Sequence, residues 1–364
     1  MINPTQLNES TRTLLDALIK KTPDTRIKQG VTHSMIKRPS EKFPEETRLE
    51  VCGKLLSSGS FGFVFNGRGA VHENNLTFYK KPADKKRIIK AIPLKKESES
   101  KEYNQYRSTQ KQIIKEAYRT QQCDPDAHCK KPVFDDDFGY IIMRKAPGYD
   151  LMDFIIDMRK GKFTAPPAYL VTVMLNIMVE VAKIHKRGWI IRDLKPENII
   201  INPDTLEIKI RDFATALPIS KKTCKSIKGT YPFIPPETRY LSKISPAIDI
   251  YALGIIFFEL FGYRKKIKES IINQLRSLNP IKDNPFLFMD DLSYSNQIYL
   301  IDLFKSFIHL NPADRISLDQ AIPDVEDILQ DILNNSTEEL SSSAEELTES
   351  DDDELTQAFK SYSI

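Results

Sequence analysis

The sequence has few of the residues that cross-link a chain or anchor it in a membrane. It contains four cysteines, one tryptophan and five histidines in 364 residues. Cysteines this sparse do not build a disulfide framework, so we expect a reducing, cytoplasmic setting. The apolar runs, such as residues 250–262, are too short to span a bilayer. The first residues (MINPTQLNES) lack the basic and apolar pattern of a signal peptide.

Two of the cysteines lie near a histidine, a combination that can bind metal. Cys123, His128 and Cys129 are close together in the sequence. Zinc sites usually combine such a group with a second ligand pair at a similar spacing, and no such pair follows. The pattern therefore favours ordinary thiols in a loop over a metal site.

The net charge of +3 hides an asymmetry between the body and the end of the chain. Residues 324–364 carry 13 acidic residues and one lysine, which leaves 52 basic and 37 acidic residues for 1–323. A basic body with an acidic end indicates interaction with acidic partners, with a membrane surface, or of the tail with the body. It does not by itself indicate a specific nucleic-acid ligand.

Hydrophobic periodicity predicts a small β-rich lobe over residues 47–146. Four short runs have the apolar content of strands: residues 49–56, 61–66, 87–94 and 140–143. A polar insertion, 72–86, separates the second and third runs. Residues 97–122 contain almost no Gly or Pro and predict a long polar helix.

The segments on either side of this lobe differ in character. Residues 1–46 predict an amphipathic helix over 4–21 and then a linker rich in Pro and charge. Residues 147–334 predict a larger, mainly helical lobe with two short β-like runs, 199–201 and 208–210. Residues 335–364, rich in Ser, Glu and Asp, are expected to be disordered. The predicted fold class is therefore α+β with two lobes.

A cluster of small residues lies between two of the β-like runs, in LLSSGSFGFVF (residues 55–65). Glycine lets a backbone approach phosphate oxygens and point its N–H groups at them. The alternative is a plain hairpin turn. Val64, just beyond the turn, suits contact with a flat base.

Lys90 lies in an apolar strand context, RIIKAI. A charge in such a place needs a partner or a phosphate. Glu116, on the predicted polar helix, is the first choice of partner, and Glu102 is the second.

The segment GWIIRDLKPENIIIN, residues 188–202, places three polar groups on one loop between apolar runs. Asp193 supplies a carboxylate that can accept a hydroxyl proton. Lys195 can stabilise negative charge on a phosphoryl group in transfer. Asn198, with the later carboxylate of Asp212 in IRDFATA, can bind Mg²⁺ through oxygen.

These segments follow the order of the protein kinase signature, and residues 50–322 resemble that family. The resemblance implies a bilobal kinase fold, ATP and Mg²⁺ (or Mn²⁺) as cofactors, and a protein substrate. It assigns Asp193 as the base, Asn198 and Asp212 as metal ligands, and Lys90 as the contact to the α- and β-phosphates. The other implied nucleotide-binding positions are Ser57, Gly59, Gly62, Val64, Glu116, Met143, Arg144 and Ala146.

The resemblance extends to the later part of the chain. GTYPFIPPE, residues 229–237, resembles the end of a kinase activation segment. In NPADRIS, Arg315 is implied to pair with Glu237, and DIYALG, residues 249–254, resembles the buried anchor helix. A lysine two residues after the catalytic aspartate, here Lys195, and a threonine in the docking loop, here Thr230, resemble the pattern of Ser/Thr kinases rather than that of Tyr kinases.

Three positions depart from the family pattern. Ser57 replaces the first glycine of the phosphate loop. Ile191 replaces the His that usually precedes Arg-Asp, and Ala214 replaces the Gly that usually follows Asp-Phe. Alanine disfavours φ > 0, so Ala214 is expected to restrict switching of this segment. None of the three removes a catalytic group, which favours an active enzyme over a pseudokinase scaffold. A kinase-fold enzyme acting on a small molecule or lipid is a further alternative, and the resemblance of GTYPFIPPE to a docking segment favours a protein substrate over it.

Two further features concern regulation and setting. Thr223 and Ser226 carry hydroxyls in a basic stretch, and each is a candidate phosphate acceptor that phosphopeptide mapping can test. A loop that needs no phosphate is the alternative. The acidic C-terminus resembles the Glu-rich signals of bacterial proteins exported by type IV secretion, as in Legionella, and the divergent motifs also suit a viral kinase. Such an effector would act on host proteins in a host cytosol.

Overall fold

The computed structural model describes the sheet-forming segments of the first part of the chain and nearly all of its helical part. The described residues are 35–39, 47–59, 62–72, 78–79, 86–94, 100–135, 137–221, 223, 226–239, 244–265, 267, 269–278 and 286–347. The predicted helix over 4–21 and the C-terminal residues 348–364 lie outside them.

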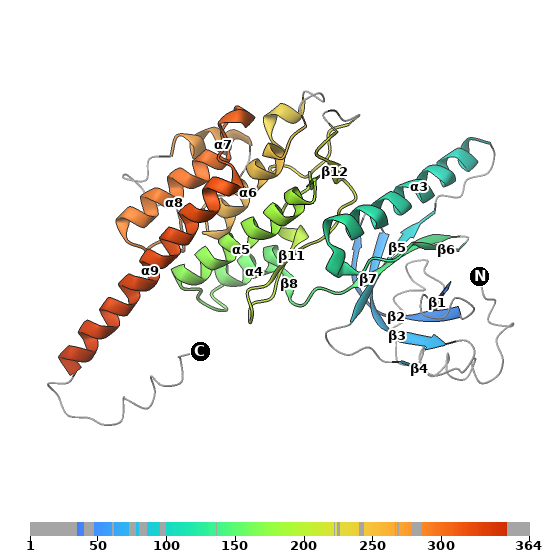
Figure 1. Ribbon diagram of the computed structural model, residues 1–364, viewed down its shortest axis with the longest axis horizontal. Helices are drawn as coiled ribbons and strands as arrows, with labels where there is room; N and C mark the ends of the chain where they lie inside the picture. The colour runs from blue at the N-terminus through green and yellow to red at the C-terminus, as the bar shows by residue number, and fades with distance from the viewer. Residues whose placement is uncertain are drawn as a thin grey trace.

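A mostly antiparallel sheet with one long helix forms the first lobe (Figure 1). Its path runs β1-β2-β3-β5-β7-β6, and β4 pairs with β3. The strands are β1 (Met35–Pro39), β2 (Thr47–Gly59), β3 (Gly62–His72), β4 (Phe78–Tyr79), β5 (Arg87–Pro93), β6 (Val133–Phe134) and β7 (Phe138–Arg144). The polar helix is α3 (Ser100–Cys123), followed by the short helix η3 (Pro125–Ala127). The predicted β-rich lobe is confirmed.

Two short strands lie where the sequence indicated no structure. β1 falls inside the expected linker and pairs with β2 from Met35–Val51 to Pro39–Thr47. β4 falls inside the expected polar insertion and pairs with β3. Both are too short to show a period of their own, and they form because a neighbouring strand offers free backbone groups.

The sheet of this lobe has a different apolar cluster on each side. Ile89 and Ala91 pack with Phe65 and Tyr140 on one side. Ile92 and Leu94 belong to a second cluster that includes Ile113 and Ala117 of α3. Because side chains alternate along a strand, β5 contributes to both clusters and seats α3 against the sheet.

Helices dominate the second lobe (Figure 1). They are α4 (Leu151–Arg159), α5 (Pro167–Lys186), α6 (Ala247–Leu260), α7 (Glu269–Arg276), α8 (Tyr294–Phe307) and α9 (Leu318–Leu347). Short strands line the side that faces the first lobe: β8 (Tyr149–Asp150), β9 (Trp189–Ile190), β10 (Ile199–Ile201), β11 (Ile208–Ile210) and β12 (Leu217–Pro218). Three 3-10 turns complete it: η4 (Pro196–Asn198), η5 (Pro236–Arg239) and η6 (Pro312–Asp314).

Helices α5 and α6 form the centre of this lobe. α6 is apolar all round and nearly every residue in it is buried, which is typical of a helix enclosed by others. α5 is long and apolar enough to cross a membrane by length and composition, but 56% of its apolar window is buried inside the protein. Burial of that extent is what a core helix of a folded lobe shows.

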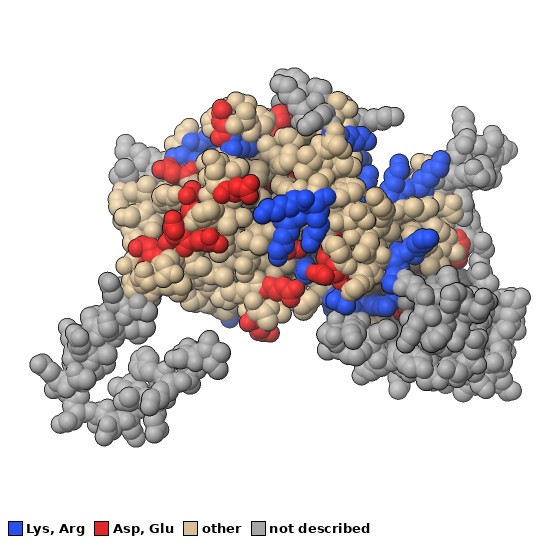
Figure 2. Space-filling view, in the orientation of Figure 1, with Lys and Arg blue, Asp and Glu red and all other residues tan. Residues whose placement is uncertain are grey.

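The end of the helical lobe differs from the sequence-based boundary. Residues 335–364 were expected to be disordered, yet α9 continues to Leu347. Its first part has the apolar face that packs on α5, with Val325, Ile328 and Ile332 buried. Disorder was predicted from low apolar content alone, but a polar segment can extend a helix that packing has already started. In Figure 2, acidic side chains gather over the helical lobe and basic ones nearer the middle of this face.

A buried ion pair joins η5 to the residue that follows η6. Arg315 Nη1 and Nη2 donate to Glu237 Oε1 and Oε2 at 2.6 and 2.7 Å. Arg315 also donates to the carbonyls of Ala247 and His309. Both side chains of the pair are almost fully enclosed. The structure thus forms the pair that the family resemblance implied.

Removal of Arg315 should therefore destabilise the fold strongly. Arg315→Met leaves the Glu237 carboxylate buried without its cation, which typically costs about 3–5 kcal/mol. Urea unfolding followed by circular dichroism measures the loss. Arg211→Met, at an exposed ion pair with Asp150, is the control and should cost less than about 1 kcal/mol. Equal effects of the two substitutions would contradict the prediction.

Candidate active site

The tip of the β2–β3 hairpin is built for a glycine. Gly62 has φ of 113°, and a Cβ there would lie 2.2 Å from the carbonyl oxygen of Ala91. Only glycine tolerates both the angle and the contact. Across the hairpin, Ser57 pairs with Val64 and Gly59 with Gly62. The four loop positions named from the sequence therefore lie together at one end of the sheet.

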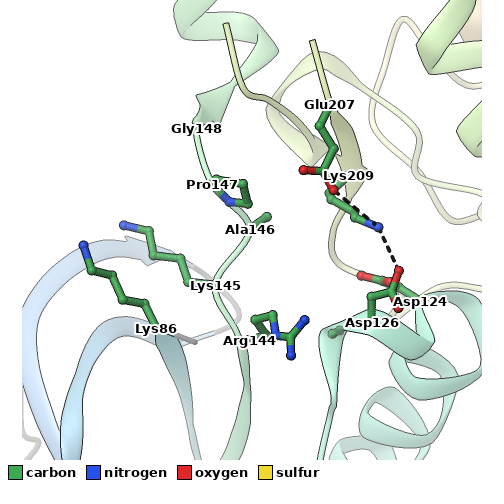
Figure 3. A pocket seen from close by; sticks show the side chains of 11 residues that line it. Lys86, Asp124, Asp126, Arg144, Lys145, Ala146, Pro147, Gly148, Glu207 and Lys209 are labelled. Atoms are coloured by element: carbon green, nitrogen blue, oxygen red, sulfur yellow. Dashed lines mark hydrogen bonds and ion pairs between the residues drawn. The ribbon is translucent and has the colours of Figure 1, made fainter. Parts of the chain in front are cut away.

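The connection between the lobes carries a second feature, a cavity of about 580 Å³ (Figure 3). Arg144 and Ala146, two of the expected nucleotide-binding positions, line it. Its other side includes Lys209 of β11, which lies 3.2 Å from Asp126 of η3. None of the predicted catalytic or metal-binding side chains lines this cavity. Met143, the third of these connecting positions, packs instead against the apolar cluster beside α3.

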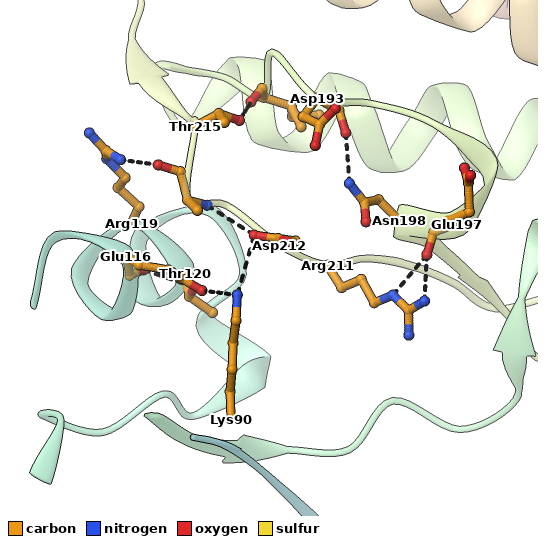
Figure 4. Close-up of polar contacts among 12 residues, drawn as sticks. Lys90, Glu116, Arg119, Thr120, Asp193, Glu197, Asn198, Arg211, Asp212 and Thr215 are labelled. Atoms are coloured by element: carbon orange, nitrogen blue, oxygen red, sulfur yellow. Dashed lines mark hydrogen bonds and ion pairs between the residues drawn. The ribbon is translucent and has the colours of Figure 1, made fainter. Parts of the chain in front are cut away.

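Lys90 lies between two carboxylates from different parts of the chain (Figure 4). Its Nζ is 2.5 Å from Glu116 Oε1 on α3 and 3.6 Å from Asp212 Oδ1. Burial alone would lower the pKa of Lys90, but the two carboxylates outweigh it and raise this pKa above its usual value. The ammonium group therefore stays charged. Glu116, the first choice from the sequence, is a partner of Lys90.

Asp193 and Lys195 meet at the hydroxyl of Thr230. Thr230 Oγ1 donates to Asp193 Oδ1 at 2.8 Å, and Lys195 Nζ donates to Thr230 Oγ1 at 2.8 Å. Lys195 Nζ is also 3.6 Å from Asp193 Oδ2. Asn198 Nδ2 donates to the Asp193 carbonyl at 2.8 Å, which fixes the side chain and leaves its oxygen available. In Figure 4, Asp212 lies between Lys90 and the Asp193–Asn198 pair.

The backbone that presents Asp193 is held by Asp249 of α6. Asp249 accepts the N–H groups of Ile191 and Arg192 at 2.8 Å each, and it lies 2.9 Å from His185 Nε2. Arg192 has φ of 70°, which costs energy for a residue with a side chain. Neither Asp249 nor His185 was predicted from the sequence to hold this backbone. The sequence does contain a signal for this role of Asp249: a carboxylate in an otherwise apolar helix needs hydrogen-bond partners when it is buried.

The segment after Asp212 is held from both lobes. Arg119 of α3 donates to the carbonyl of Ala214, and Arg192 Nη1 donates to the carbonyl of Thr215 at 3.3 Å. Arg119 was not singled out from the sequence. The left-handed turn falls on Asp212, with φ of 65°, whereas Ala214 lies outside that region. Alanine is therefore accommodated in this conformation without strain.

Thr223 and Ser226 lie further along the same segment. Both residues are exposed. Arg192 Nη2 donates to the carbonyl of Ser226 at 3.0 Å. Arg192, next to Asp193, is thus in contact with the segment that carries both hydroxyls.

Comparison with known proteins now adds to this geometry. The model of the protein kinase domain matches residues 52–325 of this chain. The chain belongs to the protein kinase family. This match also accounts for the bilobal fold, with a sheet-rich first lobe and a helical second lobe.

Individual kinases are similar over parts of the chain. Aurora/IPL1-related protein kinase 2 of Caenorhabditis briggsae is 26% identical over 181 residues, 50% of this chain and 56% of that protein. The catalytic subunit PRKX of Homo sapiens, a cAMP-dependent protein kinase, is 30% identical over 128 residues, 35% of this chain and 34% of that protein. LysM domain receptor-like kinase 10 of Oryza sativa subsp. japonica is 32% identical over 119 residues, 31% of this chain and 19% of that protein. The chain thus spans at most 56% of the length of these three relatives.

The two cysteines near His128 are separated in the kinase fold. Cys123 packs in the core of the helical lobe and Cys129 in the cluster beside α3. Burial raises the pKa of each thiol to about 12. Within the part of the chain that the structure describes, no three His, Cys, Asp or Glu side chains converge as a metal site.

Two buried carboxylates lie beside the catalytic loop. Glu197 of η4 and Glu259 of α6 each have a buried Oε2 with no hydrogen-bond partner among the described residues. Burial, helped by the charge of Glu197, raises the pKa of Glu259 to about 7. No local pattern predicts this pair because the two residues are far apart in the chain.

Glu259 should make the stability of this kinase depend on pH. Above about pH 7 the folded protein must hold the charged form, while the unfolded chain loses the same proton near its usual pKa of 4.5. Stability is therefore lost as pH rises from about 4.5 through 7. Glu259→Gln should relieve this loss by on the order of 2–3 kcal/mol at pH 8 and by little at pH 4.5.

Urea unfolding at both pH values measures this difference. Glu207→Gln, at an exposed carboxylate, is the control and should change stability equally little at both. A gain from Glu259→Gln that is the same at pH 4.5 and pH 8 would refute an elevated pKa.

Proposed function

We propose that this kinase transfers the γ-phosphate of Mg²⁺-ATP to Ser or Thr hydroxyls of proteins. The observation that carries the proposal is the contact of a threonine hydroxyl with both Asp193 Oδ1 and Lys195 Nζ, at 2.8 Å each. An aliphatic hydroxyl between a carboxylate and an ammonium group has the surroundings that an acceptor hydroxyl needs.

Asp193 orients the acceptor hydroxyl and accepts its proton. The Lys195 ammonium lies 3.6 Å from Asp193 Oδ2, while Asp193 Oδ1 faces the hydroxyl. Lys195 stabilises charge on the phosphoryl group in transfer. When the acceptor binds, its hydroxyl takes the place that Thr230 Oγ1 marks.

The residues present also suit a divalent cation. Asn198 Oδ1 and the Asp212 carboxylate supply hard oxygen donors, and Mg²⁺ commonly takes one or two such ligands together with phosphates and waters. Mn²⁺ accepts the same donors. When bound, the ion neutralises phosphate charge. Lys90 adds a cation held in place by Glu116.

Two other functions use the same fold. A pseudokinase scaffold would hold nucleotide without turnover, and a kinase-fold enzyme could act on a small molecule or lipid. The joint presence of Lys90, Asp193, Asn198 and Asp212 speaks against the scaffold. The buried Glu237 at the end of the activation segment, seated by Arg315, favours an ordered protein-docking loop.

Loss of the Asp193 carboxylate should abolish transfer. We expect Asp193→Ala to lower incorporation of labelled phosphate into generic acceptor proteins by about 100-fold or more, because general base catalysis contributes about 10²–10⁴-fold. Asp204→Ala, at an exposed turn residue, is the matched control. Phosphoamino-acid analysis of the product distinguishes Ser and Thr from Tyr.

The outcomes separate the three functions. Equal incorporation by wild type and Asp193→Ala would overturn the kinase assignment. Nucleotide binding without any incorporation would favour the scaffold, and activity on lipids alone would favour the third function.

The acidic C-terminus supports a proposal about setting: that residues 348–364 direct export of the kinase into a host cytosol. A translocation reporter fused to the full chain should lose delivery when these residues are deleted. The deletion ends after Leu347 so that α9 stays whole. Replacing Asp351, Asp352, Asp353 and Glu354 by amides tests the charge alone. Unchanged delivery by both variants would refute the signal.

A further inference from the structure

Helix α3 contacts the segment that carries Asp212 at a second point, one turn beyond Glu116. Arg119 Nη1 donates to the carbonyl oxygen of Ala214, a residue 95 positions later in the chain. Figure 4 shows this bond on the far side of the helix turn from Lys90. The familiar ion pair of Glu116 with Lys90 makes no use of it.

The same peptide segment orients the Asp212 carboxylate. The N–H of Ala214 donates to Asp212 Oδ1 at 3.3 Å. Asp212 Oδ1 is also the atom that lies 3.6 Å from Lys90 Nζ, and Lys90 returns to α3 through Glu116. Helix α3 is therefore connected to Asp212 by two routes: through Glu116 and Lys90, and through Arg119 and the backbone of Ala214.

We propose that Arg119 is a positioning residue: it holds the backbone at Ala214 so that the Asp212 carboxylate keeps its orientation when α3 is packed inward. The inference rests on the proposed Mg²⁺-ATP chemistry for its effect on turnover. The coupling of α3 to Asp212 does not depend on that chemistry and can be measured without turnover.

The surroundings of Arg119 make its bond specific. Its guanidinium is half-buried, and burial together with the positive charge of Arg192 lowers the pKa of Arg119. Two cations this close are tolerated because each donates to a carbonyl: Arg119 to Ala214 and Arg192 to Thr215. Adjacent carbonyls are thus held from opposite lobes. Asp212, two residues before the first of these carbonyls, has φ of 65°, a conformation that costs energy and needs support from surrounding contacts.

Three variants test the proposal: Arg119→Met, which keeps the length but not the donors; Arg119→Lys, which keeps one charged donor; and Lys115→Met, an exposed position on the same helix. Amide hydrogen exchange of residues 212–217 reads the backbone directly. The Mg²⁺ concentration needed for ADP binding tests whether the Asp212 carboxylate is placed to bind the metal. Steady-state kinetics measure kcat and the KM for ATP.

Arg119→Met should raise the exchange of residues 212–217 and the Mg²⁺ concentration for half-maximal ADP binding by about 10-fold or more, the range expected for losing a charged hydrogen bond. It should lower kcat by a similar factor with little change in the KM for ATP. Arg119→Lys should recover most of each effect, and Lys115→Met should show none.

The results distinguish the inference from the proposed function. If wild type transfers phosphate and Arg119→Met matches it in all three readouts, the positioning role is wrong. Faster exchange throughout α5 and α6 would mean general destabilisation and would also overturn it. If wild type transfers no phosphate while Arg119→Met still speeds local exchange and weakens Mg²⁺-dependent ADP binding, the positioning role stands and the proposed function fails.

Discussion

The catalytic loop depends on one carboxylate inside the helical lobe. Asp249 has no exposed surface and is surrounded by the apolar residues of α6. A charge buried in this way is tolerated only when it is hydrogen-bonded. Its two oxygens accept the N–H groups of Ile191 and Arg192 and lie beside His185. Asp193 follows directly, so its position is set by a helix more than fifty residues later in the chain.

Helix α3 contributes side chains to the contact between the two lobes. α3 packs on the sheet through Ile113 and Ala117. From there Glu116 contacts Lys90, and Arg119 reaches the segment after Asp212. A shift of α3 would therefore alter the cation of the first lobe and the carboxylate of the second at once. This arrangement places control of the site in helix packing rather than in the catalytic groups themselves.

Much of the fold could be predicted because its signals are local. The strand at Lys90, the polar helix before Glu116 and the strands flanking residues 202–207 follow from periodicity and came out close to their bounds. β1 and β4 were missed because each depends on a neighbour for its pairing. The end of α9 was missed because a helix propagates beyond its packed part.

The sequence by itself determined which groups are available: a lysine in an apolar strand, an Asp-x-Lys-x-x-Asn loop and a later Asp, in kinase order. Residue type and spacing suffice for this, since chemistry belongs to side chains. Only the tertiary structure decided that Glu116 meets Lys90, that Thr230 lies between Asp193 and Lys195, and that Arg119 holds Ala214. These choices depend on distances between residues far apart in the chain, which local pattern does not encode.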